Sequence, residues 1–150
     1  MIQSLLVAVD GSDAAGRALD LAADLAARCG ASLVLLHVQS PAAVRELAAA
    51  HAQFAALEHS ALSEAEMARA VGAELLAQAE LRARAAGATS VETQQREGEA
   101  AEQILDVAAI CGADIVVTGR RGLGRVAELM LGSVSHEVAQ KARCACLTVS

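Results

Sequence analysis

The sequence is nearly free of aromatic residues: it has no Trp, no Tyr and one Phe among 150 residues. Its apolar side chains, which make up 55% of the chain, are therefore mostly those of Ala, Leu, Val and Ile. Small aliphatic side chains of this kind suit helices that pack closely on a sheet. The same lack excludes a ligand site that relies on aromatic stacking.

A surplus of basic residues is also absent. The chain has 12 Lys and Arg residues against 18 Asp and Glu residues, which gives a formal net charge of −6. A protein that neutralises many phosphates of a nucleic acid needs a basic surface. Nucleic acid is therefore not expected as the main partner.

Long apolar runs are missing as well. A membrane-spanning helix needs roughly 20 consecutive apolar residues, and residues 1–10 hold only a short apolar run with no basic leader. We expect no membrane span and no signal peptide, which predicts a cytoplasmic protein. Because the 150 residues contain no internal repeat and no linker, a single domain over residues 1–150 is expected.

The four cysteines lack the spacing of a metal site. Cys29 and Cys111 each end a helical pattern just before a glycine, and Cys144 and Cys146 flank one alanine. Zinc sites use pairs such as C-x-x-C, whereas this chain offers only C-x-C. We expect reduced, structural thiols, as is usual for intracellular chains, and no metal site built from protein ligands alone.

Apolar and amphipathic stretches alternate along the chain. Apolar runs at 2–9, 31–38, 115–118 and 146–149 predict buried strands, and alternation over 89–94 predicts an edge strand with one solvated face. Helical patterns cover 12–29, 98–111 and 133–142. The stretch 41–86 predicts two helices, or one broken near His59 and Ser60, with a capping box at Ser63 and Glu66. This order predicts an α/β fold, an open doubly wound parallel sheet with helices on both faces, Rossmann-like.

Ligands of such sheets bind beyond the carboxyl ends of the strands, where the strand order reverses. Three features fall at predicted carboxyl ends: Asp10-Gly11-Ser12, His37-Val38, and the stretch that begins at Gly119. We expect these three features to lie close together in space.

The stretch at the fourth predicted strand end is rich in small residues. It reads Gly119-Arg120-Arg121-Gly122, then nine residues, then Gly132-Ser133 at a helix start. Free backbone N–H groups beside glycines favour phosphate binding, and Ser133 could donate to a phosphate oxygen or help to hold a cation. Alternatively the glycines only permit a tight turn and Ser133 only caps its helix. The spacing alone leaves both interpretations open.

The neighbouring polar residues also have two interpretations each. Asp10 could accept hydrogen bonds from ribose hydroxyls, or it caps the turn into the first helix. Val38 could offer its main-chain groups to an adenine edge. Arg120, Arg121 and Arg125 add positive charge beside the glycines, although arginines in an exposed loop are usually only solvated.

No catalytic group stands out in the sequence. The four histidines are scattered and none pairs with a Ser or Cys at a spacing that indicates a nucleophile. His37, at the end of an apolar strand, is expected to be a packed residue. A G-x-x-x-x-G-K-[ST] loop is absent. Because no general base is evident, a bound nucleotide is expected to be a ligand rather than a rapidly hydrolysed substrate.

Several of these stretches resemble the universal stress protein family. Residues 5–12 are similar to that family's first strand and turn, 35–38 to its second strand, and 113–122 with 131–135 to its signature. Within the family, G-x-x-G-x9-G-[ST] marks the ATP-binding branch, and Gly119, Gly122, Gly132 and Ser133 meet every fixed position. The resemblance covers nearly the whole chain.

The resemblance implies a five-stranded sheet of order 3-2-1-4-5 and a homodimer paired through the last strand. It also implies a bound adenine nucleotide, ATP or a relative such as AMP or a cyclic nucleotide, often with Mg²⁺ or Mn²⁺. Adenosine would lie near residues 8–10 and the Val38 backbone, and the phosphates near the glycines. The implied nucleotide-binding residues are Ala8, Val9, Asp10, Val38, Thr118, Gly119, Arg120, Arg121, Gly122, Gly132, Ser133 and Val134.

The chain departs from the family at a few positions. Ala8 stands where some ATP-binding members have Pro, and Ala145-Cys146 stand where Pro-Val is common. Motif and resemblance together predict an ATP-binding stress-response regulatory protein. Two alternatives stay open: a homodimeric interaction module that does not use nucleotide, and a slow ATPase.

Overall fold

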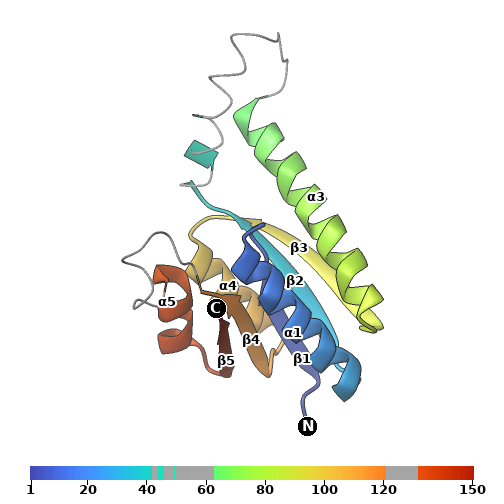
Figure 1. The fold of residues 1–150 in the computed structure, drawn as a ribbon. Helices are drawn as coiled ribbons and strands as arrows, with labels where there is room; N and C mark the ends of the chain where they lie inside the picture. The colour runs from blue at the N-terminus through green and yellow to red at the C-terminus, as the bar shows by residue number, and fades with distance from the viewer. Residues whose placement is uncertain (42–43, 46–48, 50–62, 121–131) are drawn as a thin grey trace.

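The structure, a computed structural model, describes residues 1–41, 44–45, 49, 63–120 and 132–150. Five strands form one parallel sheet of order β3-β2-β1-β4-β5 (Figure 1), as the resemblance implies. The elements in chain order are β1 (Ser4–Ala8), α1 (Asp13–Cys29), β2 (Ser32–Gln39), α3 (Glu64–Ala85), β3 (Ser90–Glu97), α4 (Ala100–Ile110), β4 (Ile115–Gly119), α5 (Ser133–Lys141) and β5 (Ala145–Val149).

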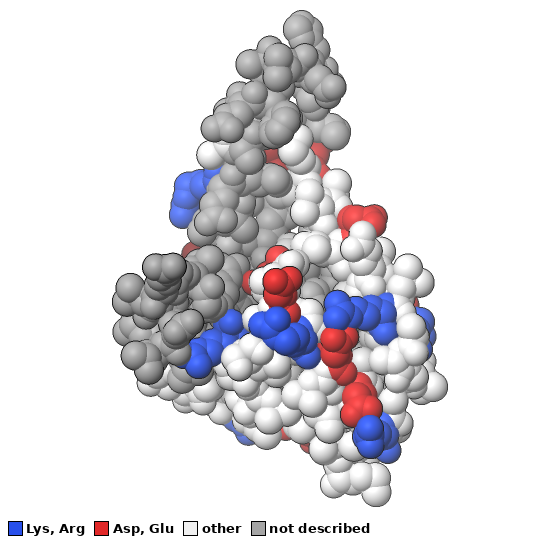
Figure 2. Space-filling model, in the orientation of Figure 1, with Lys and Arg blue, Asp and Glu red and all other residues white. Residues whose placement is uncertain are grey.

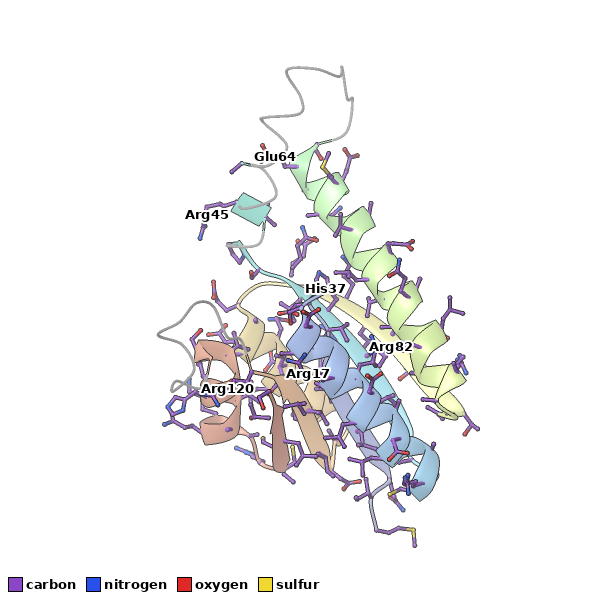
Figure 3. The ribbon with its side chains drawn as sticks, in the orientation of Figure 1. Arg17, His37, Arg45, Glu64, Arg82 and Arg120 are labelled. Carbon is purple, nitrogen blue, oxygen red and sulfur yellow. The ribbon has the colours of Figure 1, made fainter. Side chains whose placement is uncertain are left out.

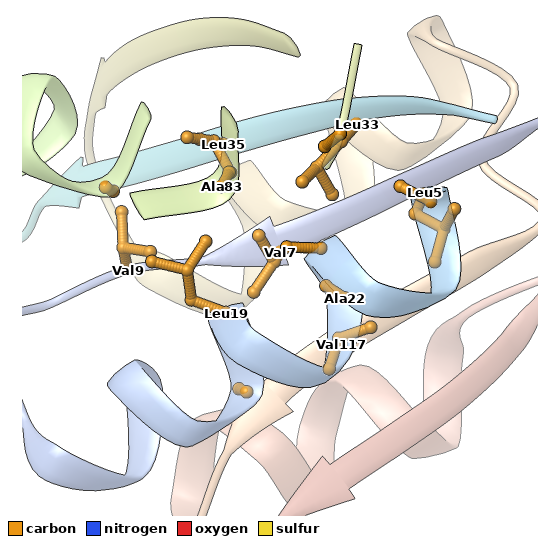
Figure 4. Packing of buried hydrophobic residues seen from close by; sticks show 14 of the residues in the cluster. Leu5, Val7, Val9, Leu19, Ala22, Leu33, Leu35, Ala83 and Val117 are labelled. Atoms are coloured by element: carbon orange, nitrogen blue, oxygen red, sulfur yellow. The ribbon is translucent and has the colours of Figure 1, made fainter. Parts of the chain in front are cut away.

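Helices cover both faces of the sheet, as predicted. In Figure 1, α1 lies in front of the sheet and α4 behind it. Alternate side chains of β1 point to opposite faces: Leu5 and Val7 pack in the cluster beneath α1 and α3, and Leu6 packs in the cluster beneath α4 and α5. Figure 4 shows the first cluster, in which Val7, Leu35 and Val117 are fully buried. The apolar runs of the central strands thus follow from burial on both faces.

The helix ends match the capping signals of the sequence. The Ser12 hydroxyl accepts a hydrogen bond from the Ala15 N–H (3.2 Å), and Gly30 ends α1 with a left-handed backbone (φ 65°). At the start of α3 the predicted capping box is present: Ser63 and Glu66 exchange hydrogen bonds of 3.3 and 2.8 Å. The Ser63 N–H lowers the pKa of the Glu66 carboxyl below its ordinary value.

The stretch 41–86 is only partly described. Pro41 is helical and the Val44 N–H donates to the Ser40 carbonyl, so a helical turn begins at the predicted place. The second predicted helix is α3, which ends one residue before Ala86. The expected break near His59 and Ser60 lies outside the described residues.

Strand β3 lies at a sheet edge, as the alternating pattern predicts, but it is longer than expected. It continues to Glu97, three residues beyond Gln94, because its pairing with β2 extends to Gln39↔Glu97. The added residues are polar, with Gln95 and Arg96 partly exposed and Glu97 exposed, so hydropathy carries no sign of them. Backbone pairing with β2 extends the strand, and the side chains of Gln95 and Glu97 also bond Arg69 of α3.

At the amino end of the sheet, one carboxylate ties the first strand to the fourth. Asp114 accepts hydrogen bonds from the N–H groups of Gln3 (2.7 Å) and Ser4 (3.1 Å). These two donors lower the pKa of Asp114 below its ordinary value. The contact closes the end of the sheet opposite to the predicted ligand edge.

Candidate functional site

The carboxyl ends of β1, β2 and β4 meet around a cavity of about 240 Å³. Three helices complete its wall. Ala15 comes from the first turn of α1, Ala100 and Ile104 come from α4, and the start of α5 adds a third side. The lining residues are Ala8, Val9, Asp10, Ala15, Leu36, His37, Val38, Ser40, Ala100, Ile104, Thr118, Gly119, Gly132, Ser133 and Val134.

Nine of the twelve predicted site residues line this cavity, so the three predicted strand ends do converge. Arg120 is not among the lining residues; its N–H donates to the Val149 carbonyl (2.6 Å), which extends the β4–β5 ladder. Figure 3 labels its side chain near α5. Arg121 and Gly122, with Arg125, lie outside the described residues.

Asp10 both caps the turn into α1 and lines the cavity. Its carboxylate accepts a hydrogen bond from the Ser12 N–H (2.9 Å), which confirms the turn-capping interpretation. The same residue lines the cavity and is exposed. The turn thus holds the carboxylate at the mouth of the cavity, and capping does not exclude a contact with a ligand.

Gly119 is a glycine for a reason that the sequence does not reveal. A Cβ atom at this position would lie 2.6 Å from the Ala14 carbonyl carbon and 2.6 Å from the Ala15 nitrogen. These are main-chain atoms of α1, which cannot move aside as a flexible side chain can. The first turn of α1 therefore lies directly against the carboxyl end of β4.

The start of α5 bears on one of the two interpretations of Ser133, namely that its side chain only caps the helix. Gly132 is the N-cap, no side chain caps the helix, and Ser133 is the first helical residue with an exposed side chain. The interpretation that Ser133 only caps its helix is therefore wrong. The Ser135 hydroxyl instead donates to the Gly132 carbonyl (3.0 Å). The first backbone N–H groups of a helix have no intrahelical partner. Here the helix begins at Gly132 and Ser133, and both residues line the cavity.

Six lining residues were not predicted as part of the site: Ala15, Leu36, His37, Ser40, Ala100 and Ile104. Leu36 precedes Val38 by two residues in the same strand and so shares its face, a signal that the sequence does offer. Ala100 and Ile104 are one helical turn apart, but no local pattern says that α4 covers this part of the sheet. His37 is packed, as expected, with 9% of its surface exposed.

A larger hollow of about 580 Å³ lies between α1 and α3, on the other side of the Val9–Ser12 turn. It contains no residue of β2, β4 or α5, so the predicted motif does not reach it. At its rim Arg82 binds both carboxylate oxygens of Asp20 (2.6 Å each). Figure 2 shows basic and acidic side chains side by side on this face rather than a basic patch. We therefore place the candidate site in the smaller cavity.

Three further findings concern the described residues. They contain no cluster of three or more His, Cys, Asp or Glu side chains able to hold a metal ion. None of the helices described is long and apolar enough to cross a membrane. All four cysteines are free thiols, of which Cys29 is exposed, and burial raises the pKa of Cys144 and of Cys146.

The sheet order and the cavity at the point where it reverses define a doubly wound α/β protein with a ligand-type site. The chain belongs to the universal stress protein family, since the sequence model described as "Universal stress protein family" matches residues 1–150. The universal stress protein YxiE of Bacillus subtilis is 36% identical over 149 residues, and the match covers 99% of each chain.

Solved structures show the same fold. A universal stress protein crystallised in complex with cAMP is 30% identical, with a TM-score of 0.69, covering 99% of this chain and 96% of that one. A universal stress protein from Archaeoglobus fulgidus in complex with dAMP has the same TM-score of 0.69 at 24% identity, with 100% of both chains covered. The second likeness bears on the fold alone.

Proposed function

We propose that this protein binds an adenine nucleotide, ATP or a close relative, in the cavity beyond β1, β2 and β4, as a ligand that regulates a stress response. The observation that carries the proposal is the convergence of nine predicted residues, from four separate segments of the chain, on one cavity. The 30% identical relative with bound cAMP supports an adenine nucleotide as the ligand class.

The base end of the cavity is apolar with a polar main-chain edge. Leu36 and Ile104 are buried aliphatic residues of the lining, and Val38 is partly exposed. Main-chain N–H and C=O groups at Val38 match the alternating donor and acceptor pattern of an adenine edge. Aliphatic side chains above and below the ring replace the aromatic residues that this sequence lacks.

The sugar and phosphate ends follow from charge and hydrogen bonding. Asp10, at the mouth of the cavity, is a suitable acceptor for ribose hydroxyls. The N–H groups and the Ser133 hydroxyl at the start of α5 suit phosphate oxygens. A Mg²⁺ or Mn²⁺ ion would be held mainly by the phosphates, as is usual for these ions at nucleotide sites.

The lining favours binding over hydrolysis. Asp10 and His37 are its titratable residues among those described. Asp10 accepts the Ser12 N–H at the sugar end, and the His37 Nδ1 atom is engaged by the Val9 carbonyl. Neither is placed to activate a water molecule at a terminal phosphate. Occupancy of the site would then act by changing which conformation or partner is favoured.

Equilibrium dialysis with radiolabelled ATP and magnesium tests the proposal. We expect retention by the wild-type protein; no retention at millimolar ATP would refute nucleotide binding. The lack of Trp and Tyr gives a second readout, because nucleotide that co-purifies would dominate the absorbance at 260 nm. Mass spectrometry of the released ligand would then distinguish ATP from AMP or a cyclic nucleotide.

Two substitutions locate the site. Gly132 has an ordinary backbone conformation (φ −54°, ψ 146°) that Val can adopt, and Gly132→Val adds a branched side chain at a residue that lines the cavity. Binding should disappear. Ser133→Ala should weaken ATP about tenfold or more, the usual cost of losing a hydrogen bond to a charged group. Ser90→Ala, at the exposed start of β3, is the matched control and should bind ATP as the wild type does.

We also propose a homodimer that pairs through β5, which lies at the edge of the sheet. The Ala145 N–H and the Val149 carbonyl both bond toward β4, so by alternation the Thr148 N–H faces the open edge. Thr148→Pro removes that donor and leaves the β4–β5 ladder complete. Analytical ultracentrifugation should show a dimer for the wild type and a monomer for the variant. A dimer without nucleotide binding would favour the interaction-module alternative.

A further inference from the structure

His37 is a buried polar residue that the proposed function does not use. It lies at the end of the sheet where α1 begins (Figure 3), and 9% of its surface is exposed. Its Nδ1 atom lies 2.8 Å from the Val9 carbonyl oxygen. A carbonyl oxygen has no proton to give, so Nδ1 carries the proton and donates.

Val9 is the residue at which β1 leaves the sheet. The last pair of β1 and β2 is Ala8↔Leu36, and the Val9 N–H still donates to the Leu36 carbonyl (2.8 Å). Val9 is only 7% exposed, so its carbonyl needs a partner inside the protein. The imidazole of His37 is that partner. The Val9 N–H is thus held by Leu36 and the Val9 carbonyl by His37, immediately before Asp10.

The same contact lies at the place where the ladder between β1 and β2 ends beside Val38. In a parallel ladder the bond after Val9 N–H to Leu36 C=O would run from the Val38 N–H to the Val9 carbonyl. In this structure the Val9 carbonyl accepts from the His37 side chain. By alternation the main-chain groups of Val38 point to the β1 side of β2, beyond the last residue of β1, where the cavity lies.

Helix α3 holds the imidazole in place from the other side. A Cβ atom at Gly72 would lie 2.7 Å from the His37 Cδ2 atom and would also collide with the Gln95 side chain. Gly72 thus lets the α3 backbone approach the ring closely. The ring is therefore packed between α3 and the end of β1, and the hydrogen bond of its Nδ1 atom joins it to Val9.

We infer that His37 is a positioning residue for the nucleoside: by holding the Val9 carbonyl it sets Asp10 at the sugar and leaves the Val38 main chain facing the base. This inference rests on the proposed adenine-nucleotide site. His37 itself touches neither the sugar nor the base through its side chain, and acts through Val9.

Two amide variants, each of which places its amide near one of the two ring nitrogens, test this role. The side-chain amide of Asn reaches the position of Nδ1, whereas that of Gln reaches further, to the position of Nε2. His37→Asn therefore keeps a donor for the Val9 carbonyl, and His37→Gln removes it while it keeps a polar side chain of similar length. Affinities for ATP and for 2′,3′-dideoxy-ATP are measured by calorimetry, after thermal melts without nucleotide show that each variant is folded.

His37→Gln should weaken ATP binding about tenfold, the cost of one unsatisfied buried group, and reduce the preference for ATP over the dideoxy analogue. His37→Asn should recover most of both. The inference is overturned if His37→Gln binds ATP as the wild type does, or if both variants lose affinity equally with the preference unchanged. Failure of the wild type to bind ATP would instead refute the proposed function, and the inference with it.

Discussion

Gly119 offers the sharpest test of the packing at the candidate site. Gly119→Ala adds one methyl group, whose carbon would lie 2.6 Å from two main-chain atoms of α1 and 2.9 Å from the Ala14 carbonyl oxygen. Real carbon contacts are about 3.5–4.0 Å, so α1 or β4 must shift. The first turn of α1 also carries Ala15, which lines the cavity, so the shift would reach the site.

The magnitude follows from the cost of overpacking. Forced backbone shifts cost about 1–3 kcal/mol, and for a chain of this length each kcal/mol lowers the melting temperature by about 2–4 °C. Gly119→Ala should therefore lower the melting temperature by about 2–12 °C in the absence of nucleotide. Circular dichroism at 222 nm during heating, with urea unfolding as a second measure, gives the value.

Gly16, on α1 itself, provides the matched control. A Cβ atom there would meet only the far end of the Arg82 side chain, at 3.3 Å, and that guanidinium can move. Because Ala favours a helix interior over Gly by about 1 kcal/mol, Gly16→Ala should be neutral or slightly stabilising. A Gly119→Ala protein as stable as the wild type would refute the close contact between α1 and β4.

Two further predictions concern ionisable groups. Asp114 has a folded-state pKa below its ordinary value, so its contribution is complete above the unfolded-state pKa and is lost as pH falls below about 4 through the folded value. Asp114→Asn should therefore lose stability at pH 7 and differ less from the wild type at pH 3, as urea midpoints would show; an equal difference at both values would contradict the assignment. Burial raises the pKa of Cys144 and Cys146, so at neutral pH they should react with Ellman's reagent more slowly than the exposed Cys29. Cys29→Ser should abolish the fast phase; its persistence would place the reactive thiol elsewhere.

The hydrophobic pattern predicted most helices and strands because each of them buries the faces that its apolar residues mark. Leu33 to Leu36 are apolar on both faces because both faces are covered, and Gly30 stops α1 because its backbone is left-handed. The strand order was available only through the family resemblance, since hydropathy does not say which strands are neighbours. The polar end of β3 escaped prediction because backbone pairing with β2 and polar contacts with Arg69 hold it, and neither leaves a mark in the hydropathy.

At the site, spacing predicted which strand ends meet but not why each residue is needed. The sequence indicated that Gly119 exposes the backbone to a phosphate. The structure shows that a glycine is needed there because the α1 backbone leaves no space for a Cβ atom. His37 was correctly expected to be packed, but its bond to Val9 depends on where β1 leaves the sheet, which no local pattern marks. Ile104 lines the cavity only because α4 crosses this part of the sheet.

The central place of β1 in the sheet has a consequence for synthesis of the chain. Its partner on one side, β2, follows soon after, whereas the pair Leu5↔Ile115 joins residues from opposite ends of the sequence. During translation the apolar edge of β1 that receives β4 must wait until most of the chain has emerged. Contacts of such long sequence separation slow folding and prolong the exposure of unpaired strands. A growing chain therefore carries an unpaired apolar strand at the middle of its future sheet until β4 has emerged.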